Sequence, residues 1–321
     1  MKKIFTSIII IIILFLISFS ILNDSSSILE SVKFSVNIWQ NNVFPSLFPF
    51  FVLSELFINY GFIEFISELF KPVMRLFGVK KEASFIFVMS IISGFPSNAK
   101  YVKELYNQKL INEKEASKVL MFTHFSNPLF ILGTISILFL NNKDVGLLIL
   151  FCHYISNIII GLIFRKYIFY KENSNISIKK SILNMHNKRI SNTKSFGEII
   201  TNSILNAINT LLLILGVITL FLIITTILNN NLKLNDFYTS ILNGFIEMNQ
   251  GLKYVSMLNI SLKFKTIISV MIISFGGLSV HMQIISILSD TKIRYLPFLL
   301  SRIIHTILSG FLTFILFDFF I

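Results

Sequence analysis

Cysteine and charged residues are both scarce in this sequence. Cys152 is the single cysteine among 321 residues, which excludes an intrachain disulfide and a cysteine-based metal site. Lysine, arginine, aspartate and glutamate together make up 14% of the chain, whereas a soluble domain contains about 25%. The composition therefore excludes an ordinary soluble globular protein.

Acidic residues are the scarcer of the two charged classes, with 16 Asp and Glu against 28 Lys and Arg, a formal net charge of +12. The basic residues lie in loops and at the ends of apolar segments, where they set membrane orientation and contact anionic lipid. No RNA- or DNA-binding signature accompanies them. Nucleic acid is therefore not expected as a partner.

Apolar residues dominate the chain: 54% are hydrophobic, and several apolar segments are about 20 residues long. These segments predict an all-α polytopic membrane protein. We divide it into four parts. They are an N-terminal membrane anchor with an outside loop at 1–42, a first membrane half at 43–168, a basic cytoplasmic linker at 169–195 and a second membrane half at 196–321.

The first apolar run, Ile4–Leu22, follows Lys2 and Lys3. It is longer than the apolar core of a typical signal peptide, so an uncleaved anchor that starts inside and ends outside is favoured. The following residues, Asn23–Asn42, are interpreted as a polar outside loop.

The run Ala83–Ile92 ends in Ser-Gly-Phe-Pro-Ser-Asn-Ala, residues 93–99. Gly94 and Pro96 predict a helix break, and Ser97 or Asn98 can cap a new helix to Gln108. Four charged residues after the break make a full crossing costly, so a re-entrant hairpin is expected.

A second break is predicted at Ser274–Ser279, inside the apolar stretch Thr266–Leu288. Each half then has the order span, interfacial amphipathic helix, broken hairpin, span. The charge pattern starts the first unit outside and the second inside. This predicts an inverted-topology repeat with two broken, re-entrant helical hairpins, whose tips point to a transporter's binding site.

The linker carries the strongest orientation signal, because Arg165–Lys194 contains many basic residues and one acid, Glu172. This places it in the cytoplasm, against anionic lipid. Before the linker, Lys118–Leu140 is expected to be a full span that unwinds near Asn127-Pro128. After the linker, Phe196–Asn206 is expected to form a short helix that precedes the next span.

Several ionisable residues lie within apolar segments: Glu55, His124, His153, His281, Arg302 and His305. A buried arginine should face a cavity or a partner, and its guanidinium suits a carboxylate. Arg302 is predicted to contact substrate, with snorkelling to the interface or structural pairing to Glu55 as the alternatives. The excess of basic over acidic groups favours an anionic substrate.

Half-helix N-termini present unpaired N–H groups and partial positive charge, which attract carboxylate or phosphate. The predicted substrate-binding residues are Gly94, Ser97, Asn98, Asn127, Ser279, His281 and Arg302. No catalytic residue, metal ligand or cofactor is predicted.

Two other function classes were weighed. An enzyme is disfavoured because the sequence has no His-Glu-x-x-His motif, and Gly277-Leu278-Ser279 lacks the second glycine of a nucleophile turn. A non-transporting membrane scaffold would need neither matched broken helices nor a buried arginine.

Three strings carry a family resemblance: Phe-Pro-Ser-Leu-Phe-Pro-Phe at 44–50, the Ser-Gly-Phe-Pro-Ser-Asn-Ala string, and His-Phe-Ser-Asn-Pro-Leu-Phe at 124–130. With Gly-Phe-Ile-Glu at 244–247 and the second break, they resemble the YlbJ family of sporulation integral membrane proteins. That family belongs to the wider nucleoside-recognition, or Gate, group.

The resemblance implies a cell-membrane protein of an endospore-forming bacterium that is needed for spore maturation. It implies movement of dipicolinic acid, a pyridine with two carboxylates, across the mother-cell-derived outer forespore membrane. The alternatives are a nucleoside or other small solute of the Gate group, or a scaffold. The coupling ion, the transport direction and homo-oligomer formation stay open.

Overall fold

The computed structural model describes residues 2–170 and 177–321, and every regular element within them is helical. Six helical segments of the described chain are long and apolar enough to cross a membrane. They are Phe5–Asn23, Ser25–Asn59, Asp144–Lys166, Phe196–Asn231, Leu262–Leu288 and Tyr295–Phe320. The prediction of an all-α polytopic membrane protein is confirmed.

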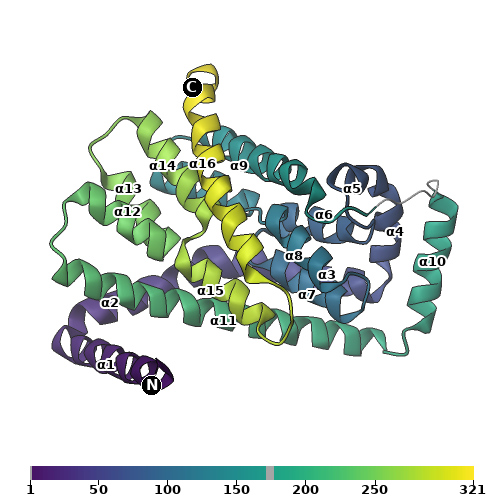
Figure 1. The fold of residues 1–321 in the computed structure, drawn as a ribbon, viewed down its shortest axis with the longest axis horizontal. Helices are drawn as coiled ribbons and strands as arrows, with labels where there is room; N and C mark the ends of the chain where they lie inside the picture. Colours follow the sequence, from purple (N-terminus) through teal and green to yellow (C-terminus); the bar gives the residue numbers. More distant parts are fainter. Residues whose placement is uncertain (1, 171–176) are drawn as a thin grey trace.

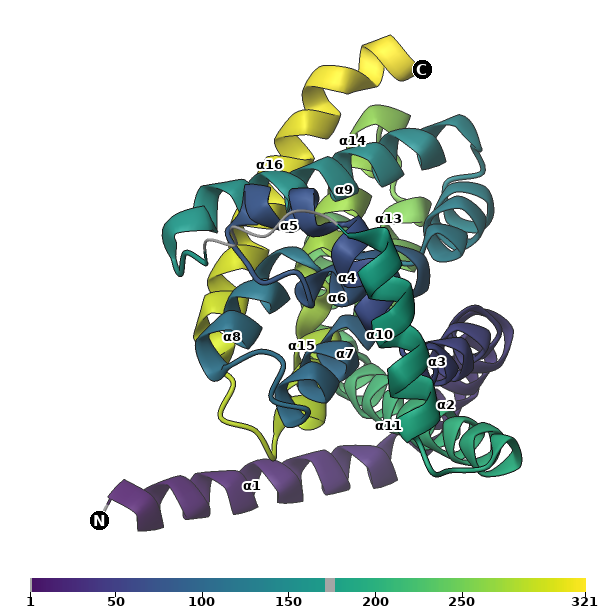
Figure 2. The same cartoon turned by 90° about the vertical axis from the view of Figure 1, so that its right-hand side faces the viewer.

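Most of helix α1 (Lys2–Asn23) projects away from the bundle, as the view in Figure 2 shows, and its contacts are with α2 and α11. None of its apolar window is buried inside the protein. Its side chains therefore have no protein core to pack against, which is the expected state of a helix surrounded by lipid. The anchor role assigned to it remains a prediction.

The expected outside loop at Asn23–Asn42 is instead helical. Helix α2 (Ser25–Ile38) passes through a π-helical turn, η1 (Trp39–Val43), into α3 (Phe44–Asn59). Residues at helical spacing on its buried face pack on α11, with Ser31 and Ser35 hydrogen-bonded to Thr226 and Thr219 at 2.5 and 2.8 Å. Tertiary packing thus stabilises a helix that its polar composition did not indicate.

Helix α11 (Phe196–Asn231) is a single helix of 36 residues. The short separate helix predicted at Phe196–Asn206 is therefore wrong. Polar residues such as Asn206 and Asn209 do not interrupt the helix. Their side chains face a water-accessible cavity, described below, and so the helix continues through them.

The first predicted hairpin is confirmed. Helices α6 (Ala83–Ser93) and α7 (Ser97–Asn107) turn back on each other at Gly94. The Phe85 and Tyr101 rings are 5.6 Å apart, although a straight helix would separate them by about 24 Å. The Tyr101 hydroxyl also reaches the Ser93 hydroxyl at 3.2 Å.

The second hairpin lies elsewhere than predicted. Helices α12 (Asp236–Ile246) and α13 (Met248–Met257) fold against each other around Glu247, beside α14 in Figure 1. A Cβ added to Gly251 would lie 2.1 Å from the Gly244 Cα. Two glycines seven residues apart therefore permit backbone contact across the hairpin, where the sequence was interpreted as one interfacial helix.

The segment predicted as a second re-entrant hairpin is a broken span. Helices α14 (Leu262–Phe275) and α15 (Gly277–Leu288) follow each other through Gly276, which has a φ of +92°. Its counterpart is α8 (Glu113–Phe122) followed by the π-helical η2 (Phe130–Phe139), with an unwound stretch between them. The predicted unwinding at Asn127-Pro128 is confirmed.

Each half thus has the order span, hairpin, broken span, span, which ends in α9 (Asp144–Ile163) or α16 (Tyr295–Phe320). Equivalent spans run antiparallel. Along α9 and α16, Asn157 pairs with Arg302 and His153 with His305. The α2–α3 helix and α11 pair in the same reversed order, from Ser31 with Thr226 to Trp39 with the Leu211 carbonyl. Antiparallel equivalents are what an inverted-topology repeat requires.

Between α3 and the first hairpin lie two short amphipathic helices, α4 (Phe62–Leu69) and α5 (Lys71–Phe77). The linker also contains a helix, α10 (Ile178–Ser191), which packs on α4. Arg189 lies over the Tyr60 ring at 4.6 Å. Part of the linker is therefore docked against the first half; residues 171–176 lie outside the described chain.

We predict that Gly251→Ala destabilises the second hairpin by about 1–3 kcal/mol, because the added methyl collides with backbone that has no rotamer to change. Gly216→Ala in α11 is the matched control, since no atom lies within 4 Å of its Cβ position. Thermal melting of both detergent-solubilised proteins would check this. Equal melting temperatures would contradict the contact.

Candidate functional site

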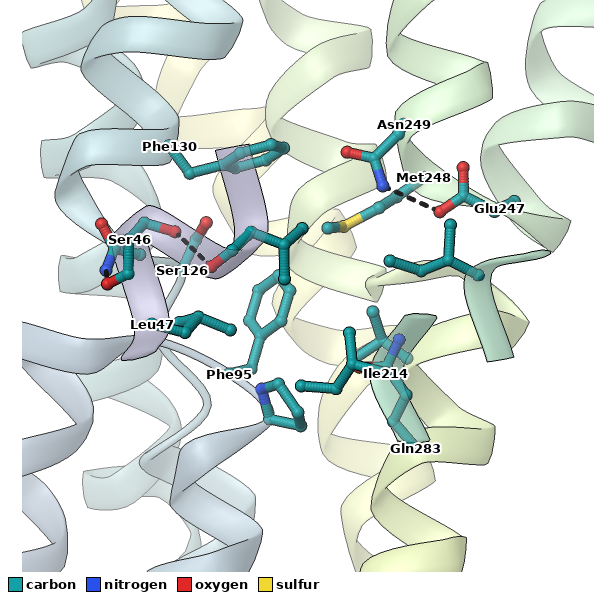
Figure 3. A pocket seen from close by; sticks show the side chains of 15 residues that line it. Ser46, Leu47, Phe95, Ser126, Phe130, Ile214, Glu247, Met248, Asn249 and Gln283 are labelled. Atoms are coloured by element: carbon teal, nitrogen blue, oxygen red, sulfur yellow. Dashed lines mark hydrogen bonds between the residues drawn. The ribbon is translucent and has the colours of Figure 1, made fainter. Parts of the chain in front are cut away.

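A cavity lies where the two hairpin tips meet the two broken spans (Figure 3). Its wall is contributed by both halves of the protein and by α3 and α11. The lining residues are Val43, Ser46, Leu47, Phe95, Pro96, Ser126, Asn127, Phe130, Ile214, Ile218, Glu247, Met248, Asn249, Val280 and Gln283.

The first hairpin tip is bound to the unwound part of the first broken span. Gly94 has a φ of +76°, and a Cβ there would lie 2.4 Å from the Asn127 nitrogen, so glycine is required. The Phe95 N–H donates to the Phe125 carbonyl at 2.7 Å, and the Asn127 amide donates to the Ser93 carbonyl at 3.2 Å. The predicted residues Gly94 and Asn127 therefore meet, and Asn127 also lines the cavity.

Ser97 and Asn98 begin α7 and are both fully buried. The Ser97 hydroxyl donates to the Gly94 carbonyl and lies 2.6 Å from the Ser93 hydroxyl, so the protein itself engages it. Neither polar atom of the Asn98 side chain has a hydrogen-bond partner within the described residues. A buried amide without a partner is costly, and although neither Ser97 nor Asn98 lines the cavity, Asn98 follows the lining residue Pro96 by two positions, so its amide stays a candidate for binding solute.

Glu247 forms the second hairpin tip and is fully buried. Its carboxylate accepts from the Gln250 N–H and from the Asn249 amide, both at 2.9 Å, and so caps α13. We did not predict Glu247, Asn249 or Gln283 as site residues. Glycines flanking Glu247 at 244 and 251 are the sequence signal that could have revealed this tip.

The second broken span brings Ser279 beside the Glu247 carboxylate. Gly277, with a φ of +67°, approaches the hairpin tip, where its Cβ position is 3.1 Å from the Met248 nitrogen. His281 faces the protein: its Nδ1 lies 2.7 Å from the Tyr295 hydroxyl and its Nε2 3.1 Å from the Phe275 carbonyl. Neither of the predicted residues Ser279 and His281 is among the lining residues of the cavity, to which α15 contributes Val280 and Gln283.

Arg302 is fully buried but is not among the lining residues. Its guanidinium donates to the Met121 carbonyl, to the Asn157 side-chain oxygen at 3.0 Å and, at 3.5 Å, to the His124 carbonyl. These carbonyls border the unwound stretch of the first broken span. Arg302 therefore holds that stretch against α16.

The alternative partner suggested for Arg302 was Glu55, and that pairing is wrong. Glu55 instead forms an ion pair with Lys100 at 2.9 Å. Glu55 and Lys100 are far apart in the sequence and lie on different helices. Only the packing of α3 against α7 could therefore show that these two residues pair.

The cavity wall combines one carboxylate, three amides and two hydroxyls with the Phe95 and Phe130 rings, and it contains no basic side chain. Its enclosed volume is about 50 Å³, far below the 300–1,000 Å³ of typical ligand pockets. The hairpin tips therefore close on the site in this conformation. Among the described residues, no group of three or more His, Cys, Asp or Glu side chains could hold a metal ion.

A known protein family matches part of the first half of the chain. The Gate family, described as nucleoside recognition, matches residues 41–143, which include the first hairpin and the first broken span. No solved structure matches the chain.

A curated relative matches nearly the whole length. The sporulation integral membrane protein YlbJ of Bacillus subtilis is 31% identical over 319 residues, covering 91% of this chain and 78% of the relative. Identity at this level, across both hairpins and both broken spans, shows that this integral membrane protein belongs to the YlbJ family of sporulation integral membrane proteins.

Proposed function

We propose that the protein is a secondary transporter that moves a small solute through the cavity between its hairpin tips. One observation carries this: two hairpins and two broken spans, related as an inverted repeat, meet at a small, largely apolar cavity that carries a few polar side chains. In such transporters the substrate site lies at the repeat interface and is built from discontinuous helices.

The first candidate substrate is a small organic anion, dipicolinic acid, moved across the outer forespore membrane during sporulation. Helices α7, α13 and α15 all begin at the cavity, at Ser97, Met248 and Gly277, and helix N-termini favour carboxylates. The pyridine ring would have Phe95 and Phe130 as aromatic neighbours in the wall.

A nucleoside is the second candidate, favoured by a specific feature of the wall. Glu247 is the lining carboxylate, and no lysine, arginine or histidine accompanies it there. A carboxylate beside Asn249 and Gln283 suits a neutral solute with hydroxyl and N–H donors. The Gate match to residues 41–143 agrees with this candidate.

Uptake of radiolabelled dipicolinate, uridine and phosphate into proteoliposomes would test the proposal. Uptake of dipicolinate alone would support the anion, and uptake of uridine alone would support the nucleoside. Absence of uptake of all three, by protein shown to be folded, would favour the scaffold alternative.

We predict that Asn98→Leu lowers uptake of the transported solute at least tenfold while leaving the melting temperature unchanged or higher. The substitution removes an amide that makes no hydrogen bond within the described residues, so no protein contact is lost. Ile92→Leu, at a half-exposed α6 position, is the control for a change nearby. Normal uptake by Asn98→Leu would exclude Asn98 from the site.

A further inference from the structure

A second cavity lies next to the central cavity and is lined by the same helices α3, α11 and α15. It has a volume of about 370 Å³ and lies between α3, α7, α11 and α15. We name it the vestibule; its polar wall includes Glu55, Lys100, Asn206, Asn209, Thr210 and Ser286.

The vestibule lies one helical turn from the central cavity along the same helices. Lys100 follows Pro96 by four residues, Ser286 follows Gln283 by three, and Thr210 precedes Ile214 by four. Residues at these spacings share a helix face. The two cavities are therefore consecutive parts of one groove.

An aromatic ring and an ion pair lie between the vestibule and the central cavity. Phe51 is fully buried in α3, and the Lys100 amine lies 5.2 Å from the centre of its ring. The same amine pairs with the Glu55 carboxylate at 2.9 Å, with both side chains mostly shielded from solvent. Phe51 is four residues from Leu47, which lines the central cavity, and four from Glu55, which lines the vestibule, so ring and ion pair lie between the two cavities.

At its other end the vestibule adjoins a polar cavity of about 440 Å³, because both are lined by Glu55, Glu104 and Asn206. This outer part is bounded by Lys188 and Lys194 of the basic linker. With Lys100 and Lys103, the two cavities expose four lysines against two glutamates. By the positive-inside rule this end faces the cytoplasm.

The opposite side of the central cavity differs in charge. A cavity of about 290 Å³ there shares Ser46 and Phe130 with it, and its lining contains no ionisable residue. The Asn42 amide donates to Thr134 at 2.8 Å across this side. The groove is thus electrically asymmetric, with its positive charge gathered at the linker end.

We propose that the vestibule is the cytoplasmic access path for an anionic substrate, and that Phe51 with the Lys100–Glu55 pair is its gate. A substrate carboxylate takes the place of Glu55 on Lys100, which frees Phe51 to move and opens the groove to the central cavity. Lysines around the vestibule raise the local anion concentration. This inference rests on the proposed transport of an anion.

Thiol labelling tests the access path without requiring transport. Ser286→Cys and Asn209→Cys place thiols in the vestibule, and Ile285→Cys and Leu212→Cys place them on exposed neighbours outside it. The natural chain is the unreactive baseline, because its single cysteine is buried. The probe is an impermeant, negatively charged methanethiosulfonate, applied to inside-out and right-side-out vesicles.

We expect the two vestibule thiols to react about tenfold faster from the cytoplasmic side than from the other, and faster with the anionic reagent than with its cationic analogue. The two control thiols lie on apolar exposed faces of membrane-spanning helices, so the charged reagents should label them slowly from both sides. Equal reaction of vestibule and control thiols, or faster reaction from the opposite side, would overturn the access path.

Dipicolinate uptake tests the gate. Lys100→Gln is expected to lower uptake at least tenfold, whereas Lys103→Gln, in the same vestibule but paired with Asp290 at 2.7 Å, should lower it about twofold. Equal uptake by the two variants would overturn the gate. One-sided labelling without uptake of any solute would instead reject the proposed transport and leave the vestibule as a one-sided access path.

Discussion

Replacing Arg302 by methionine is expected to lower the free energy of unfolding by about 3–5 kcal/mol and to abolish uptake as a consequence. The guanidinium donates to two main-chain carbonyls beside the unwound stretch that follows α8 and to the side-chain oxygen of Asn157 in α9. Methionine fills a similar length but donates nothing, so the Met121 carbonyl and the Asn157 oxygen lose this donor, while the His124 carbonyl keeps only the Asn157 amide.

Thermal melting of the purified variant would check the prediction, with Ile303→Met as the control at a half-exposed neighbouring position. Arg302→Lys should fall between the two, because an ammonium lacks the planar fork that reaches several acceptors at once. If Arg302→Met melted like the natural protein and still failed to transport, Arg302 would be the substrate counter-charge that the sequence predicted.

Replacing Glu247 by glutamine is expected to change the pH dependence of uptake, in a way that depends on the substrate. A dipicolinate carboxylate about 5 Å from an ionised Glu247 would be repelled by about 3 kcal/mol at an effective dielectric constant of about 20. Protonation of Glu247 removes this repulsion, so dipicolinate uptake by the natural protein should rise about tenfold or more as pH falls.

Glu247→Gln is neutral at every pH, so its dipicolinate uptake should be high at neutral pH and no longer vary with it. Glutamine keeps the shape and one acceptor for the Gln250 N–H, which preserves the cap of α13. For a nucleoside the expected effect of Glu247→Gln is the opposite, a loss of uptake. Loss of the charged acceptor should cost about 1.5–3 kcal/mol, or about 10–100-fold in uptake, at all pH values.

Initial rates of dipicolinate and uridine uptake between pH 6 and pH 8, for both proteins, would distinguish these outcomes. Asn249→Asp, which adds a carboxylate beside Glu247, is the converse variant and should weaken dipicolinate uptake further. A flat pH profile of dipicolinate uptake by the natural protein, together with unchanged uridine uptake by Glu247→Gln, would remove Glu247 from the substrate's surroundings.

Local backbone chemistry made part of the fold predictable. Gly94 and Pro96 interrupt an apolar helix, and Gly276 ends another in a left-handed conformation; both breaks occur where the residues indicated. The unwound stretch at Asn127-Pro128 was predicted for the same reason. Proline and glycine act within a few residues of themselves, so their effects need no knowledge of distant partners.

The type of each break was not predictable in the same way. The segment after Gly94 carries charges and turns back, and the segment after Gly276 was assigned the same path but continues onward. The true second hairpin depends on Gly244 meeting Gly251 across the turn at Glu247. Whether a broken helix reverses depends on which backbone it can pack against, and that partner is set by the whole bundle.

The sequence by itself determined that this is an all-helical membrane protein, which helices break and that two halves repeat, because apolar length and Gly/Pro chemistry are local properties. Only the tertiary structure decided that Glu247 faces the cavity while Arg302 braces an unwound segment and Lys100 pairs with Glu55. A buried charge is stabilised by whichever groups surround it, and those groups come from helices far apart in the chain.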